Sequence, residues 1–84
     1  MQRYFFDVRT GDKLATDEEG MMLPSLTAVQ TEASKSLAEL ARDMIRLQSG
    51  HRLAVEVRDA AGSIVNETRL QWSMQARPGE GEGV

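Results

Sequence analysis

Few side chains in this sequence could support catalysis. His51 is the single histidine among 84 residues, and it follows a segment with helical spacing, so we expect it to complement the carbonyl end of a helix. Ser49, His51 and Asp59 supply the residue types of a hydrolase triad, but no nucleophile elbow or oxyanion loop accompanies them. The sequence therefore predicts no catalytic residue, and a minimal enzyme that uses His51 or the acidic loop described next is the least favoured function.

Hard oxygen ligands gather in an acidic loop that contains Asp12, Asp17, Glu18 and Glu19. Their spacing lacks the alternating acids, the glycine at the sixth position and the distant glutamate of a calcium loop. Gly11 and Gly20 belong to neither of the glycine motifs that cradle phosphates. We therefore predict no metal and no cofactor, and we interpret the acidic loop as a solvated turn.

Two segments before residue 24 determine how the N-terminal part of the chain folds. Residues 3–9, RYFFDVR, alternate with period two and predict a strand with Tyr4 and Phe6 facing the core. A turn at Gly11 leads to a short second strand over residues 13–16. Residues 21–23 lead into Pro24 and are expected to lie outside the sheet.

Apolar residues recur every three or four positions from residue 26 to about 48, which predicts one long amphipathic helix that Gly50 ends. Ser25 is its expected N-cap, and Thr27 with Gln30 offers a rival capping box two residues later. Residues 52–58 alternate again and predict a strand. A turn with Gly62 leads to a partner strand over residues 63–72, on which Ile64 is expected inward and Val65 outward. The order is ββαββ, an α+β fold with one helix on one face of a four-stranded, mostly antiparallel sheet. Joining the hairpins through their first strands, order 2-1-3-4, is the preferred topology.

Composition and length favour one small domain. We expect residues 1–73 to form it and residues 74–84, rich in glycine and glutamate, to be a disordered tail. The sequence contains no cysteine, shows neither a signal peptide nor a membrane span, and is expected to be cytoplasmic. The net charge of −3 specifies no partner.

The sheet face away from the helix is the candidate surface. Its expected residues are Arg3, Phe5, Asp7, Arg9, Arg52, Ala54, Glu56, Arg58, Val65, Glu67 and Arg69. Five arginines against three acids give it a charge of +2. An aromatic among arginines could bind single-stranded nucleic acid by stacking and phosphate contacts. Cross-strand ion pairs are the favoured alternative, because the molecule as a whole is acidic.

Self-association is the favoured function. A helix of some 23 residues, about 35 Å long, would overhang strands of about 20–23 Å and leave Leu26 or Leu47 uncovered. A homodimer could cover these leucines or pair an edge strand, and a core this small would gain stability from it. We therefore expect a protein-interaction or regulatory module whose partner is a second copy or an unknown protein.

The motifs Tyr4-Phe5-Phe6, Asp17-Glu18-Glu19-Gly20 and Leu23-Pro24 resemble those of a family of short bacterial proteins, mostly alphaproteobacterial, that is known as a domain of unknown function. The resemblance covers residues 3 to about 72. It implies no activity, cofactor or catalytic residue. The chain departs from the family's pattern at position 7, where Asp7 stands in place of the common histidine.

Overall fold

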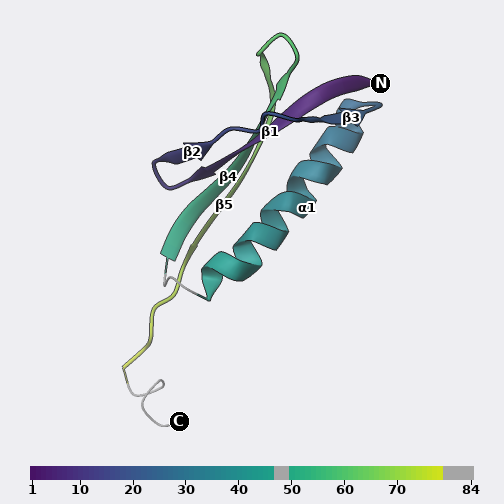
Figure 1. Cartoon of the computed structure of the whole chain (residues 1–84). Coiled ribbons are helices and arrows are strands. Elements are labelled where there is room, and N and C mark those ends of the chain that lie inside the picture. Colours follow the sequence, from purple (N-terminus) through teal and green to yellow (C-terminus); the bar gives the residue numbers. More distant parts are fainter. Residues whose placement is uncertain (47–49, 79–84) are drawn as a thin grey trace.

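The computed structural model describes residues 1–46 and 50–78, in which a single helix lies across one face of an antiparallel sheet (Figure 1). The elements are β1 (Gln2–Thr10), β2 (Lys13–Ala15), β3 (Met21–Leu23), α1 (Leu26–Ile45), β4 (Gly50–Asp59) and β5 (Ile64–Ser73). The predicted α+β class is confirmed. The sheet has five strands in place of the expected four.

The strand order is β2-β1-β4-β5, so the two hairpins join through β1 and β4 as predicted. The fifth strand corrects the expectation that residues 21–23 leave the sheet. They form β3, which pairs with residues 2–4 at the same edge of β1 where β2 pairs with residues 8–10. Two short strands therefore share one edge of β1, and residues 16–20 connect them (Figure 1).

A β-bulge modifies the start of β5. Arg58 pairs with Ile64 whereas Val57 pairs with Asn66, so one extra residue is inserted on β5. As a result Val65 packs against the core and Ile64 is 63% exposed. The expected facing of these two residues was therefore wrong, because a bulge shifts the period-two pattern by one position.

Helix α1 begins where the sequence predicts. The Ser25 hydroxyl accepts a hydrogen bond from the Ala28 N–H at 3.1 Å, which satisfies one of the free N–H groups of the first turn. The helix ends earlier than expected, with Arg46 as its C-cap, and Gly50 opens β4 and does not end the helix. In the described part of the chain no helix is long and apolar enough to cross a membrane.

The lengths of helix and strands match, which corrects the expected overhang. The 20 residues of α1 span about 30 Å, and the ten residues of β4 or β5 span about 33 Å. Leu26 is nevertheless 52% exposed. Leu47 lies outside the described residues.

The core lies between α1 and the centre of the sheet. It consists of Val29, Ala33, Leu37 and Ala41 from the helix and Tyr4, Leu53, Val55 and Val57 from the strands. Phe6 packs against this cluster, as its alternation with Tyr4 predicts. Two alanines on the helix face allow a close approach to the sheet, so the core is thin.

Beyond β5 the chain has no regular structure as far as it is described. Residues 74–78 are exposed and belong to neither helix nor strand. The remainder of the predicted tail, residues 79–84, lies outside the described residues.

Val55→Ala should lower the free energy of unfolding by about 2 kcal/mol, because it removes two methyl groups from a fully buried side chain. Ile64→Val, which removes one methyl group from an exposed side chain, should change it by less than about 0.5 kcal/mol. Urea unfolding followed by circular dichroism measures both. Equal effects of the two substitutions would contradict the position of the core.

Candidate interaction surface

The sheet face away from α1 is divided into two parts by the 16–20 loop. Arg3, Phe5, Asp7 and Arg58 form the covered half, where side chains contact this loop or each other. Arg9, Arg52, Ala54, Glu56, Glu67, Arg69 and Gln71 form the open half, which lines a concavity of about 590 Å³. The charged residues of the covered half hold the 16–20 loop, whereas those of the open half line the concavity.

An ion pair between Asp7 and Arg58 lies at the centre of the covered half. Asp7 is only 6% exposed, and its Oδ2 accepts a hydrogen bond from Arg58 Nε at 2.8 Å. Asp7 Oδ1 accepts from the Asp17 N–H at 2.9 Å, and Arg58 Nη2 donates to the Asp17 carbonyl at 2.8 Å. Each oxygen of Asp7 is therefore occupied, as a buried carboxylate requires.

The Asp17 side chain bonds to β1 between the segments that pair with β2 and β3. Residues 5–7 have no strand opposite them on the β2/β3 side, because β2 pairs with residues 8–10 and β3 with residues 2–4. The Phe6 N–H, which points to this side, donates to Asp17 Oδ2 at 3.1 Å. A side chain thus satisfies a backbone donor that would otherwise be left unpaired.

The same carboxylate also shapes the 16–20 loop. Asp17 Oδ1 accepts from the N–H groups of Glu19 and Gly20, each at 3.1 Å. Burial by itself would raise the pKa of Asp17, but the hydrogen bonds from Phe6, Gly20 and Glu19 and the charge of Arg58 outweigh it and hold that pKa below its ordinary value. The interpretation of the acidic loop as merely solvated was therefore wrong for Asp17.

Gly20 allows the loop to approach β1 closely. It has φ +73°, and a Cβ at this position would lie 2.9 Å from both the Tyr4 carbonyl oxygen and Arg3 Cγ. Arg3 Nη1 donates to the carbonyl of the preceding residue, Glu19, at 2.7 Å. Only glycine fits here without moving the backbone of β1.

Phe5 is not a free stacking platform. The Arg58 guanidinium lies over its ring, 4.6 Å from the ring centre. This cation–π contact occupies the face that a nucleic-acid base would need. The predicted neighbourhood of Phe5 and arginines is confirmed, but these groups stack on each other.

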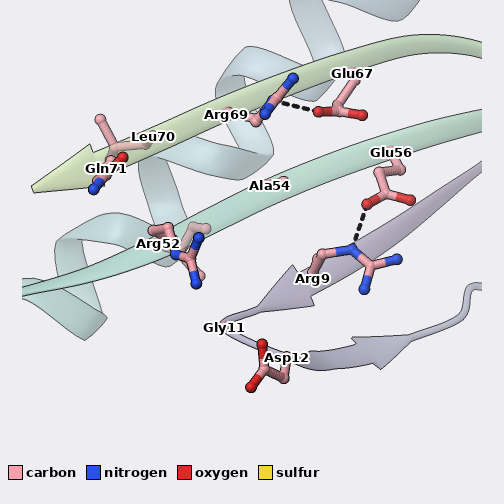
Figure 2. A pocket seen from close by; sticks show the side chains of 11 residues that line it. Arg9, Gly11, Asp12, Arg52, Ala54, Glu56, Glu67, Arg69, Leu70 and Gln71 are labelled. Carbon is pink, nitrogen blue, oxygen red and sulfur yellow. Dashed lines mark hydrogen bonds and ion pairs between the residues drawn. The ribbon is translucent and has the colours of Figure 1, made fainter.

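Three arginines of the open half, Arg9, Arg52 and Arg69, and three acids, Asp12, Glu56 and Glu67, line its concavity (Figure 2). Arg9 Nε donates to Glu56 Oε2 at 2.6 Å, a contact whose hydrogen bond and charge raise the pKa of Arg9. Arg69 pairs with Glu67 on the same strand. Arg52 makes no ion pair within residues 1–46 and 50–78. The predicted cross-strand ion pairs are thus present, except that the Glu67 pair runs along β5.

His51 lies in β4 and does not cap α1. Its ring packs against Trp72, the residue opposite it on β5, with 5.8 Å between ring centres. Its Nε2 is buried and has no hydrogen-bond partner within the described residues. Neither His51 nor Asp17 lines the concavity of the open half.

Of the residues proposed from the sequence, the structure brings two groups together. Arg9, Arg52 and Arg69 line one concavity, and Arg3, Phe5 and Arg58 meet under the 16–20 loop. Leu26 lies apart from both, at the start of α1. Sequence reasoning placed Asp17 and Gly20 in a turn but missed their close contacts with β1.

The comparisons with known proteins identify one family. A family described as a domain of unknown function, DUF6894, matches residues 3–71, which is 69 of the 84 residues. The chain belongs to this family. Neither the curated proteins nor the solved structures compared with it gave a match. The match starts within β1 and ends within β5, so the DUF6894 region contains β2 to β4 with α1, and most of β1 and β5.

Gly20 provides a stability test. Gly20→Ala should lower the free energy of unfolding by about 3 kcal/mol, the sum of a left-handed backbone penalty and a clash with β1. Gly62→Ala is the matched control, because Gly62 also has positive φ but a Cβ there would meet no atom within 4 Å. We expect about 1 kcal/mol for the control. Similar losses in urea unfolding would show that the loop does not press on β1.

Asp17 provides a pH test. Since its pKa is lower in the folded state than in the unfolded chain, its contribution to stability is present above the unfolded value, about 3.9, and is lost as the pH falls through the folded value. Urea midpoints measured from pH 7 to pH 3 should therefore fall less steeply for Asp17→Asn than for the unchanged chain. Glu18→Gln, which removes an exposed charge from the same loop, is the control. Equal slopes for both variants would contradict the role of Asp17.

Proposed function

We propose that this chain is a protein-interaction module that acts as a homodimer, with β5 as the strand through which it associates. The observation that supports this proposal most is the difference between the two edges of the sheet. One edge is protected by the devices that proteins use against unwanted pairing, and the other is long and open.

The protected edge is that of β1. Its partners β2 and β3 have only three residues each, and the gap between them is filled by Asp17. Such short edge strands offer little backbone to another chain. This edge is therefore poorly suited to association.

The open edge is that of β5. This strand has ten residues, contains neither proline nor lysine, and pairs with β4 alone among the described strands. After the bulge, residues 66–73 run in regular register with β4. A regular strand with outward-facing N–H and C=O groups can accept another strand without any rearrangement.

The thin core gives a physical reason for association. Only nine apolar residues of the described chain are buried, and three of them are alanines. A domain of this size gains little stability from its own core, and oligomerisation is a common supplement. A homodimer would add buried surface where the fold lacks it.

The alternatives find less support. Nucleic-acid binding needs an exposed aromatic, but Phe5 is covered by Arg58. An enzyme would need its titratable group in a concave site, but His51 lies outside the concavity of the open half, and of the acidic loop only Asp12 lines it. A sequence without cysteine fits a reducing compartment, so we place the module in the cytoplasm.

Size-exclusion chromatography with multi-angle light scattering tests the homodimer. We expect the molar mass to approach twice the 9.3 kDa of one chain as concentration rises, at both low and high salt, because backbone hydrogen bonds between strands are insensitive to screening. The monomer mass at every concentration would contradict the proposal. A pull-down for an unlike protein partner would then be the next experiment.

A further inference from the structure

We infer that two copies of this chain pair β5 with β5 in antiparallel orientation, about a two-fold axis that passes beside Thr68. The inference rests on the proposed homodimer and specifies its register. It follows from which backbone groups face outward and from where the charges of β5 lie.

The direction of the backbone groups follows from the pairing of β4. The Gly11 N–H donates to the Arg52 carbonyl at 3.1 Å. The backbone N–H and C=O groups of the even-numbered residues of β4 therefore point toward β1. The backbone groups of the odd-numbered residues, such as Val55, then point toward β5 and form hydrogen bonds with those of their partners, such as Thr68. It follows that Glu67, Arg69 and Gln71 direct their N–H and C=O groups outward. A second strand can bond only to these odd-numbered residues.

Charge favours one register among those that this constraint allows, because only an axis at Thr68 places Glu67 opposite Arg69. With the axis at Glu67, the Glu67 carboxylates of the two chains lie opposite each other. With the axis at Arg69, the two Arg69 guanidinium groups lie opposite each other. Like charges directly opposite each other are destabilising. An axis at Thr68 places Glu67 opposite Arg69 of the second copy, and the symmetry repeats this pair on the other side.

The Thr68 register also fits the rest of the strand. It pairs residues 66–70 with the same residues of the second copy, all within the regular part of β5 beyond the bulge. Thr68 meets Thr68 on the helix side, a favourable cross-strand pair. The ion pair between Glu67 and Arg69 within one chain is exposed to solvent and contributes little to stability. Replacing it by the same pair across the interface therefore costs little free energy.

This arrangement creates a larger surface. A two-fold axis perpendicular to the sheet keeps both helices on the same face and makes one continuous sheet of the two. Arg69 and Gln71 line the concavity of each copy and lie on β5. The two open halves therefore adjoin across the interface and form one outer surface.

A charge exchange tests the register. Glu67→Arg places two pairs of arginines opposite each other in the dimer, and Arg69→Glu places two pairs of glutamates there. Each variant alone should raise the dimer Kd by about tenfold or more. An equimolar mixture of the two variants should restore the dimer, because every pair across the interface is then of opposite charge.

The mixture controls for folding, because a variant that fails to fold would associate as poorly in the mixture as it does alone. Sedimentation equilibrium of the three samples gives the Kd values. A mixture that associates no better than the separate variants would overturn the register. Circular dichroism melting of each variant confirms that the compared samples are folded.

Cysteine cross-linking gives an independent readout, because the sequence has no other cysteine. In the Thr68→Cys dimer the two Cα atoms would lie about 4.5 Å apart, within the range of a disulfide. In the control Gln71→Cys they would lie about 20 Å apart, six residues along the ladder. Mild oxidation should therefore link the first variant and not the second.

The outcomes separate this inference from the proposed function. A dimer by light scattering in which Thr68→Cys does not cross-link, or Gln71→Cys cross-links faster, would overturn the Thr68 register and leave the homodimer standing. The exposed apolar side chains near the start of α1, Met21, Met22 and Leu26, would then be the next candidate contact. A monomer at every concentration would overturn both.

Discussion

The ion pair between Asp7 and Arg58 is the interaction on which the rest of this structure depends, because it attaches an irregular loop to the sheet. A buried carboxylate is destabilising unless charge and hydrogen bonds compensate for its lost hydration. Here Arg58 and the Asp17 N–H provide both. With the 16–20 loop fixed in this way, β2 and β3 can both pair with the same edge of β1.

This arrangement explains the roles of the residues that the sequence suggested as candidates for binding. Asp17 uses its carboxylate to accept backbone N–H groups, and Phe5 and Arg58 stack on each other. The side chains in the covered half therefore serve the fold. On the sheet, the open half and the edge of β5 are not used in this way, and the proposed self-association is based on the edge of β5. Arg52 lines the open half and makes no ion pair within the described residues.

Local patterns predicted most of the fold, and the failures have physical causes. Period-two and helical spacing gave the main strands, α1 and the Ser25 cap, because side-chain alternation reports directly on burial. The strand at Met21–Leu23 was missed, since three residues carry too little pattern and its partner residues 2–4 lie far from it in the sequence. The bulge beside Val65 and the roles of Asp7 and Asp17 depend on tertiary contacts, which no local spacing shows.

Amide hydrogen exchange followed by NMR tests the central claim, that β5 is the surface of association, most directly. The N–H groups of Asn66, Thr68 and Leu70 face β4 and should be protected at every protein concentration. Those of Glu67 and Arg69 face outward and should become protected only at concentrations where the dimer forms. Protection of alternate residues that rises with concentration is the predicted result. Rapid exchange of Glu67 and Arg69 at concentrations where light scattering shows a dimer would contradict the account.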